Sequence, residues 1–287
     1  MNLHHPNHDL LIRRKTPSGC PLPRVSHLAI AAHQDDVEIF ACHGILECFR
    51  RENRDFGAVI VTDGAGSART GRYSACGDED MQRIRREEQR KAAAIGDYAF
   101  VAQLAHPSAR IKEPGEADSV DDLFAILEAS APETLYLHNP FDKHATHIAV
   151  LGKCLAAVRG LPAERRPKRI LGCEVWRDLD WLPDARKVAL PVDDMPNLRA
   201  ALLGVFDSQI SGGKRYDLAA EGRRMANATF HQSHEVDQVE RLTFALDLSS
   251  VFHDETADPQ NFLEDVIHEF RNEVAGNARR FLTPEKT

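Results

Sequence analysis

Two clusters of polar side chains in this sequence have the residue types that bind metal ions. In the first cluster, His33, Asp35 and Asp36 directly follow the apolar run 28–32. Adjacent carboxylates repel each other and lose hydration near a protein core, and a bound divalent cation would relieve both costs. His33 and Asp36 would then supply an imidazole and a carboxylate ligand, while Asp35, pointing another way, would stay free as a base. An alternative is that Asp35 or Asp36 caps the helix that follows.

The second cluster is the run DKHATH, in which His144 and His147 stand three residues apart at the expected start of a helix. This spacing lets both imidazoles face one point. Both clusters follow a predicted strand, and a parallel sheet brings the carboxyl ends of its strands side by side. We therefore expect His33, Asp36 and His147 to close on one metal ion. Two histidines and one carboxylate form a recurring catalytic zinc set, and iron(II) or another divalent ion also suits it.

Alternating apolar and amphipathic segments predict the elements that position these clusters. Strands are expected at about 26–33, 56–62, 98–104, 134–138, 169–175 and 187–192, with a last edge strand at 241–248. Helices are expected at about 37–52, 78–96, 119–130, 145–158, 196–207, 216–229 and 261–281, with Ser119 as an N-cap and Gly96 as a C-cap. This alternation is typical of a Rossmann-like α/β fold, a mostly parallel sheet with helices on both faces. We divide the chain into an N-terminal arm (1–25), a catalytic core (26–180) and a C-terminal extension (181–287) that completes the same domain as an appended subdomain.

Composition and charge narrow the class of protein. A net charge of −8 and a pI of about 6.0 disfavour nucleic acid as a general partner. The six cysteines contain no C-x-x-C pair, and no apolar run approaches the roughly 18 residues of a membrane span. The N-terminus lacks the hydrophobic segment of a signal peptide, so a cytoplasmic location is the default expectation. His4, His5 and His8 lie in a polar, proline-containing stretch that we expect to be a disordered lead-in.

The motifs resemble those of the PIG-L/LmbE family of zinc-dependent de-N-acetylases, which act on N-acetylglucosamine-containing compounds. The first cluster is similar to that family's A-H-x-D-D-x-E motif, and the second to its H-x-x-H motif. Arg85, Glu88, Ala92 and Gly96 resemble a helix pattern R-x-x-E-x-x-x-A-x-x-x-G, and 206–209 resemble an element that ends in S-Q. The resemblance covers roughly residues 26–210.

The resemblance implies a role for each residue of the two clusters. His33, Asp36 and His147 would be the zinc ligands, Asp35 the general base, and His144 the general acid or oxyanion stabiliser. Two positions depart from the family pattern. Gln34 stands where proline is usual, and Thr146 stands where many members have an aspartate that would help to orient a catalytic histidine. Asp142, two residues before His144, is the candidate to take over that support.

Other polar residues near the predicted strand ends are candidates for substrate contacts. The resemblance implies that Arg85 touches the substrate, and Asp63, Trp176 and Arg177 are placed to hold a sugar by charge and stacking. Glu38, at the start of the first helix, is expected to support the metal ligands by hydrogen bonding.

The predicted function is removal of acetyl from an N-acetylated amino sugar or its conjugate, a small-molecule substrate. One alternative is an amidase for a different small amide, such as a mycothiol- or bacillithiol-type conjugate or an antibiotic intermediate. Another is a non-catalytic sugar-binding or regulatory module with a structural metal, although such a site does not need the free carboxylate of Asp35. The long segment after residue 210 leaves room for a homo-oligomer interface.

Overall fold

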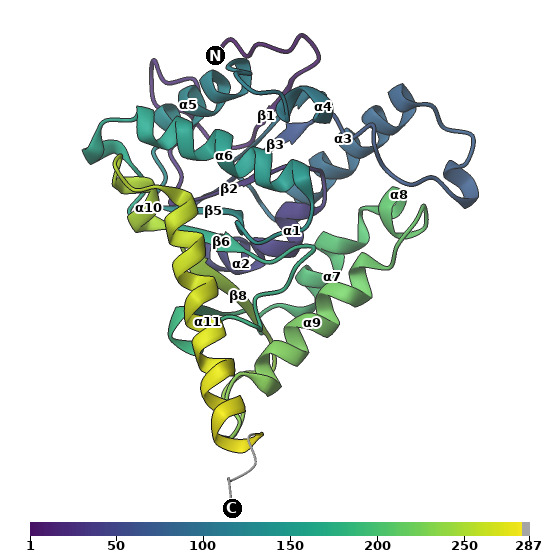
Figure 1. The fold of residues 1–287 in the computed structure, drawn as a ribbon. Helices are drawn as coiled ribbons and strands as arrows, with labels where there is room; N and C mark the ends of the chain where they lie inside the picture. The colour runs from purple at the N-terminus through teal and green to yellow at the C-terminus, as the bar shows by residue number, and fades with distance from the viewer. Residues whose placement is uncertain (283–287) are drawn as a thin grey trace, which may run out of the picture.

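A single mixed sheet runs through the computed structural model, which describes residues 1–282 (Figure 1). The strands are β1 (Asp9–Ile12), β2 (His27–Ala31), β3 (Phe56–Thr62), β4 (Phe100–His106), β5 (Thr134–His138), β6 (Arg169–Cys173), β7 (Lys187–Pro191) and β8 (Leu242–Asp247). Their order is β1-β4-β3-β2-β5-β6-β8-β7. The five central strands from β4 to β6 are parallel, while β1, β7 and β8 pair antiparallel. The α/β fold with a mostly parallel sheet is therefore confirmed.

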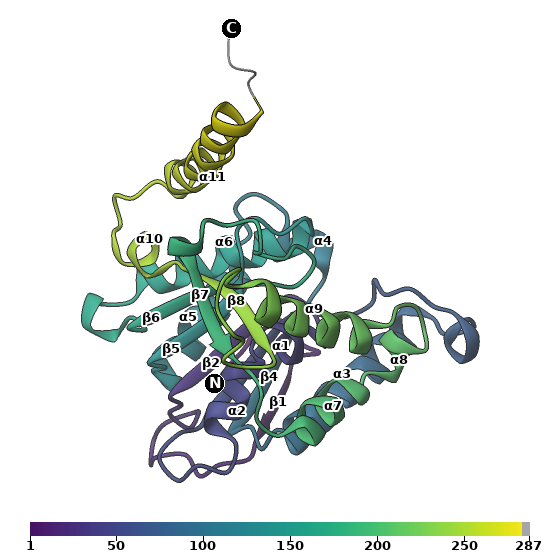
Figure 2. The same ribbon diagram turned by 90° about the horizontal axis from the view of Figure 1, so that it is seen from below.

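Helices cover both faces of this sheet (Figures 1 and 2). They are α1 (Asp36–Phe40), α2 (Cys42–Cys48), α3 (Asp78–Ile95), α4 (Ser108–Ile111), α5 (Asp118–Ser130), α6 (Ala145–Gly160), α7 (Pro196–Gly204), α8 (Asp207–Ile210), α9 (Tyr216–Phe230), α10 (Ser249–His253) and α11 (Pro259–Phe281). Within residues 1–282, none of them has both the length and the apolar character that a membrane crossing needs.

Strand β2 shows why the sheet needs a layer on each side. Its side chains alternate between faces, as in any strand. Leu28 and Ile30 join one buried cluster with residues of α5 and α6, whereas Ala29 and Ala31 join a second cluster with residues of α1 and α2. All four side chains are fully buried. A strand buried on both faces reads as a continuous apolar run, which is the pattern seen in the sequence.

Three predictions about the helices and strands are wrong: the extent of the first helix, the N-cap of the third and the place of the last strand. The single helix expected at 37–52 is two helices, because Arg224 of α9 donates hydrogen bonds to the carbonyls of Glu38 and Ile39 and so occupies acceptors that a continuous helix would use. Ser119 is not an N-cap. It lies inside α5, and its backbone N–H and hydroxyl both donate to Glu116. The last strand is not at the edge, because β8 lies between β6 and β7.

The N-terminal stretch is also more ordered than expected. Residues 9–12 form β1, which pairs with β4 at the edge of the sheet, and Asp9 forms an ion pair with Arg90 of α3. The ring and backbone N–H of His4 both bond to the carboxylate of Asp122. The run of β-forming residues at 9–12 is too short to predict a strand inside a polar segment, and it is long-range contacts, the pairing with β4 and the ion pair with Arg90, that hold it.

Candidate active site

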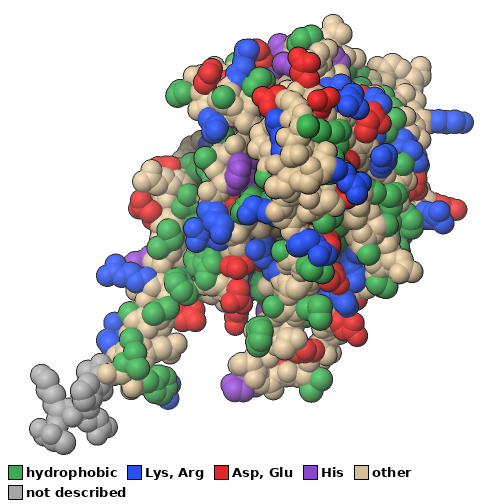
Figure 3. Space-filling model, turned by 90° about the vertical axis from the view of Figure 1, so that its right-hand side faces the viewer, with side chains coloured by type: hydrophobic (Ala, Val, Ile, Leu, Met, Phe, Trp, Pro, Cys, Tyr) green, Lys and Arg blue, Asp and Glu red, His purple; other side chains and the backbone are tan. Residues whose placement is uncertain are grey.

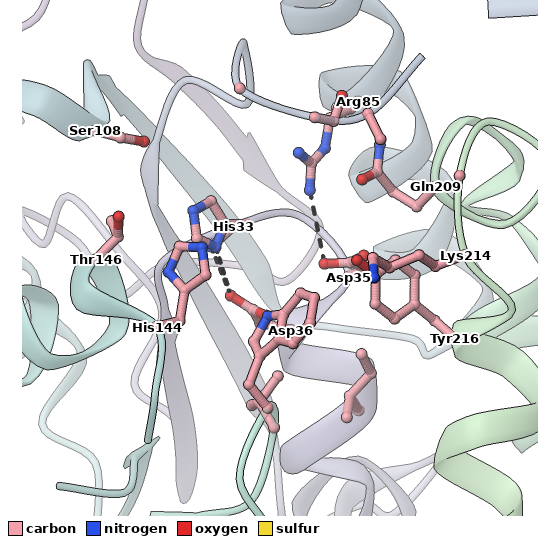
Figure 4. Close-up of a pocket in the computed structure, with 17 residues that line it drawn as sticks. His33, Asp35, Asp36, Arg85, Ser108, His144, Thr146, Gln209, Lys214 and Tyr216 are labelled. Atoms are coloured by element: carbon pink, nitrogen blue, oxygen red, sulfur yellow. Dashed lines mark hydrogen bonds and ion pairs between the residues drawn. The ribbon is translucent and has the colours of Figure 1, made fainter. Parts of the chain in front are cut away.

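The two polar clusters meet at the centre of the sheet, where its strand order reverses direction. Strands β2 and β5 are neighbours there, and the chain leaves their carboxyl ends toward opposite faces, which is the usual ligand crevice of an open α/β sheet. His33 follows β2, and the loop with His144 and His147 follows β5. A cavity of about 350 Å³ opens at this point and is lined by residues of both loops (Figure 4).

Three side-chain atoms form a nearly equilateral triangle beside this cavity, which His33 and Asp36 line and behind which His147 is buried. His33 Nδ1 lies 3.2 Å from Asp36 Oδ2 and 3.2 Å from His147 Nε2, and the last two atoms are 3.4 Å apart. Ligands of a tetrahedral zinc ion at about 2.0 to 2.1 Å would be roughly 3.3 to 3.4 Å apart. The three donor atoms present therefore fit a small divalent cation without rearrangement.

Hydrogen bonds around the triangle hold these donors in place. The backbone N–H of His33 donates to Asp36 Oδ2 at 2.8 Å, which folds the loop around the carboxylate. His147 Nδ1 lies 3.2 Å from Asp142 Oδ2, so that its Nε2 is the atom turned to the triangle. An imidazole whose other nitrogen is held by a carboxylate is the usual arrangement of a histidine metal ligand. Asp142 thus contacts the ring of His147, and its only bond to His144 is from that residue's backbone N–H, at 3.0 Å.

The electrostatics of the triangle favour positive charge. Burial raises the pKa of Asp36, but the charge and hydrogen bonds of His147 and His33 outweigh it and hold that pKa well below its usual range. For His147, burial is outweighed by Asp36 and Asp142, which together raise its pKa to about 9. Two carboxylates on either side of one imidazole thus stabilise a cation, whether a proton or a metal ion.

His138, at the end of β5, belongs to this cluster but was missed in the sequence. Its ring stacks on His147 with centroids 3.8 Å apart. Ligand atoms of Asp36, His138 and His147 also lie close enough to share a metal, as do those of His33, His144 and His147. The N–H of Ala32 donates to His138 Nε2 at 2.9 Å, so this lone pair is already used. His138 therefore packs against the ring of His147 and supports it, rather than offering this nitrogen to a metal. Its place at the end of a strand was the signal that could have found it.

Asp35 does not cap the helix that it precedes. It occupies the N-cap position of α1 with no side-chain capping bond, at a φ of 96° that non-glycine residues rarely adopt. Its carboxylate instead lies 3.6 Å from Arg85 Nη2, as Figure 4 shows. Burial, with smaller contributions from Asp36 and Glu38, raises the pKa of Asp35 well above its usual value despite the opposing charge of Arg85. Such strain at a polar loop is typical of functional sites.

His144 lines the cavity between the triangle and Trp176. Its ring centroid lies 5.0 Å from that of His33 and 6.0 Å from that of Trp176, on which it stacks. Burial and the nearby charge of His147 lower its pKa, so the neutral imidazole is favoured. Its Nδ1 is buried without a hydrogen-bond partner.

The opposite wall of the cavity comes from α3 and from the segment around α8 and α9. Arg85 of α3 lines the cavity, and its Nη2 donates to the carbonyl of Gln34 at 2.6 Å. Gln209, Lys214 and Tyr216 complete the wall (Figure 4). Lys214 ends the turn S-G-G-K (211–214) between two predicted helices, and Tyr216 was predicted only as the first residue of the helix at 216–229, because the sequence does not indicate what this segment faces.

The two weaker sequence motifs have a shared structural role in this wall. Glu88 accepts hydrogen bonds from the backbone N–H of Ser208 at 2.8 Å and from its hydroxyl at 2.6 Å. The R-x-x-E helix is thereby tied to the S-Q element, and this contact brings Gln209 beside Arg85.

The remaining candidates divide into those that line the cavity and those that do not. Trp176 lines it, and its backbone N–H donates to Asp142. Asp63 and Arg177 are not among the lining residues, and the Asp63 carboxylate accepts from the backbone N–H of Ala65 in its own loop and from Gln82 of α3.

The carboxylate of Glu38 forms no hydrogen bond with the three triangle residues. It accepts from Tyr98 and from Gln89, and Gln89 in turn accepts from the backbone N–H of Asp35, so any support that Glu38 gives is indirect.

Comparison with known proteins supports the family resemblance. Residues 28–158 match the sequence model of the PIG-L family, described as GlcNAc-PI de-N-acetylase. This segment contains His33, Asp35, Asp36, His144 and His147, so the resemblance drawn from the motifs is confirmed. No curated protein matches the chain.

Solved structures share the fold at low sequence identity. An N,N'-diacetylchitobiose deacetylase from Pyrococcus horikoshii is 15% identical with a TM-score of 0.61, and the alignment covers 82% of this chain and 87% of that one. The conserved protein TT1542 from Thermus thermophilus is 16% identical with a TM-score of 0.58, covering 78% and 94%. GalB, a 4-carboxy-2-hydroxymuconate hydratase from Pseudomonas putida, is 15% identical with a TM-score of 0.60, covering 78% and 96%. Since a deacetylase and a hydratase share it, the fold does not select the reaction.

Proposed function

We propose that this protein, a PIG-L family member through residues 28–158, is a metal-dependent N-deacetylase that releases acetate from an N-acetylated amino sugar or its conjugate. One observation carries the proposal. Two members of the His33–Asp36–His147 triangle, His33 and Asp36, line the same cavity as Asp35, whose carboxylate makes no capping bond. Neither a structural metal site nor a helix cap accounts for that carboxylate.

His33, Asp36 and His147 would hold the metal, for which zinc is the family's ion and another divalent cation is the alternative. When bound there, such an ion polarises the amide carbonyl and makes water more acidic. The donor set and its 3.2 to 3.4 Å spacing support this assignment.

Asp35 is proposed as the general base. It takes a proton from the water that attacks the acetamide carbonyl and passes it to the nitrogen of the departing amine. Burial raises its pKa toward the working pH, which improves a group that must both accept and return a proton. Arg85, 3.6 Å away, opposes this rise in pKa, favours the ionised carboxylate and holds it in position.

His144 is proposed to stabilise the oxyanion. Its lowered pKa favours a neutral ring, which still offers one N–H to the developing negative charge. Asp142 supports the metal ligand His147 in this account. The indole of Trp176 and the polar groups of Gln209, Lys214 and Tyr216 are proposed to hold the sugar.

Metal analysis combined with acetate release tests the proposal. The protein is stripped with a chelator, reloaded with zinc, iron(II) or manganese(II), and incubated with N-acetylglucosamine, N,N'-diacetylchitobiose and an N-acetylglucosamine glycoside. We expect one ion per chain and metal-dependent acetate release. Tight sugar binding by the loaded protein without acetate would favour the binding-module alternative, and release only from other small amides would favour the amidase.

A further inference from the structure

A second cavity of about 350 Å³ adjoins the candidate active site. Five residues line both cavities and so form the boundary between them: Ile39, Val175, Trp176, Lys214 and Tyr216. Within this boundary, the rings of Trp176 and Tyr216 meet edge to face with centroids 6.1 Å apart, and Lys214 Nζ lies 5.2 Å from the Trp176 ring centre. A ligand that fills the first cavity would therefore touch the entrance of the second.

The second cavity differs from the first in chemistry. Besides the shared residues it is lined by Arg215, Ala219, Ala220 and Arg223, all from the region of α9. Both arginines are already engaged, since Arg215 pairs with Asp217 at 2.7 Å and Arg223 donates to the carbonyl of Val175. What remains facing the cavity is largely aliphatic and aromatic surface. The buried histidines and carboxylates of the first cavity have no counterpart here.

We propose that this second cavity is a subsite for an apolar aglycone, an aryl or alkyl group attached to the amino sugar. This inference rests on the proposed function, because the acetamide must lie against Asp35 for the rest of the substrate to reach α9. It narrows the substrate class from free N-acetyl sugars to N-acetylated amino-sugar glycosides with an apolar substituent. Apart from Ile39, the lining residues lie outside residues 28–158, so the subsite is supplied by the part of the chain beyond the family match.

The expected effect follows from the apolar area that the aglycone would remove from water. Burying a group of the size of a phenyl ring is worth at least about a ten-fold gain in affinity. Binding energy from a remote part of the substrate is expressed in kcat/KM. We therefore expect kcat/KM for the phenyl glycoside of N-acetylglucosamine to exceed that for the free sugar by about ten-fold or more.

Ala219→Trp tests the subsite, because Ala219 is exposed at the cavity wall and an indole there would fill the space. Ala226→Trp is the matched control, since it places the same side chain at another exposed position of α9, seven residues along and lining neither cavity. The ratio of the two kcat/KM values should fall to near one in Ala219→Trp and remain at its wild-type value in Ala226→Trp. An unchanged ratio in Ala219→Trp, or a wild-type ratio near one, would overturn the subsite.

Calorimetry with phenyl β-glucoside, which has no acetamide, separates this inference from the proposed function. Binding by the wild type that is lost in Ala219→Trp and kept in Ala226→Trp supports the subsite even if no acetate is released from any sugar. In that case the deacetylase proposal fails alone. Absence of binding to the wild type overturns the subsite, whatever the activity.

A second inference comes from α11, whose C-terminal end projects beyond the body of the molecule (Figure 1), while its first half packs on the body through the contact of Phe270 with Trp181. Over its 23 residues, Val266 is the one fully buried side chain. Ile267, Val274 and Phe281, seven residues apart in succession, are 49%, 50% and 67% exposed. Figure 3 shows hydrophobic side chains along this projecting helix. Apolar residues at such spacing form the seam of a coiled coil.

The charges on α11 identify a second copy of this chain as the partner. Glu264 and Asp265 lie near the start of the helix, and Arg279 and Arg280 lie in its last turn. In an antiparallel pair with Phe281 opposite Leu263, each acidic pair lies beside the other copy's arginine pair. We infer that α11 forms an antiparallel helix pair that joins two copies of the protein.

Sedimentation of the full chain tests this inference. The wild type should be a dimer at micromolar concentration, and Val274→Glu should be a monomer, while the exposed control Asn272→Glu stays dimeric. The double change Glu264→Arg with Asp265→Arg should weaken the dimer at least ten-fold, and adding Arg279→Glu with Arg280→Glu should restore it. A monomeric wild type, or a Val274→Glu variant that remains dimeric, would overturn the inference.

Discussion

The two walls of the candidate active site are built differently. On the sheet side, Asp36 and His147 are buried and linked to each other and to Asp142. On the helix side, Lys214 is exposed and Tyr216 is only half-buried, and the wall is tied to the body through the contact between Glu88 and Ser208. The first wall lies within the family match and the second mostly outside it. The metal-ligand candidates Asp36 and His147 are thus buried and held by hydrogen bonds, whereas two of the groups assigned to recognition, Lys214 and Tyr216, are reached by solvent.

The largest expected effect comes from breaking the sheet-side wall. Asp36→Asn removes the negative charge between His33 and His147, so the metal should no longer be retained. Loss of the several kcal/mol that a metal supplies to the transition state predicts at least a 1,000-fold drop in kcat, roughly. Elemental analysis and acetate release measure the two effects. Full metal content in Asp36→Asn would contradict the ligand assignment.

Asp35→Asn should separate chemistry from metal binding on the same loop. The isosteric amide cannot accept the proton, so kcat should fall by about 100- to 10,000-fold. Metal content should stay at the wild-type level, because Asp35 lies outside the donor triangle. A variant that loses its metal would show that the base and ligand roles are exchanged.

These two adjacent aspartates also show how far sequence reasoning reaches. Residue types and strand ends were enough to group His33, Asp36 and His147, because alternating strands and helices predict a parallel sheet whose strands end at one edge. That β2 and β5 are direct neighbours is seen only in the structure. His138 was missed, since a histidine at a strand end has no partner visible in the sequence. Lys214 and Tyr216 were missed because the sequence does not show which part of the fold their segment lies against. That placement depends on long-range contacts such as the hydrogen bond between Ser208 and Glu88. The same limit explains the break between α1 and α2, which Arg224 imposes from α9.

The helix-side wall should respond more weakly. Lys214→Ala removes one exposed polar contact, so KM for an N-acetylated sugar should rise about three- to ten-fold with kcat within two-fold of the wild type. Steady-state kinetics measure this split. A drop in kcat as large as that of Asp35→Asn would mean that the two walls do not divide chemistry from recognition.

The smallest expected effect is a pH dependence of stability at the link between the walls. Burial raises the pKa of Glu88, only partly offset by hydrogen bonds from Ser208 and the charge of Arg85. A carboxyl with a raised folded-state pKa contributes its stability below its unfolded value of about 4.5, and this contribution is lost as pH rises through the folded-state pKa. Urea unfolding of the wild type and Glu88→Gln between pH 4 and 8 should show this loss only in the wild type, and parallel curves would refute it.

The most direct test of the central claim is to follow oxygen from water into the product. The metal-loaded protein is incubated with an N-acetylated amino-sugar glycoside in ¹⁸O-labelled water, and the acetate is analysed by mass spectrometry. We predict one ¹⁸O atom per acetate at early times, equimolar free amine, and neither product after chelation. Acetate without label, or an amine released equally well by the chelated protein, would contradict hydrolysis by water at the His33–Asp36–His147 site.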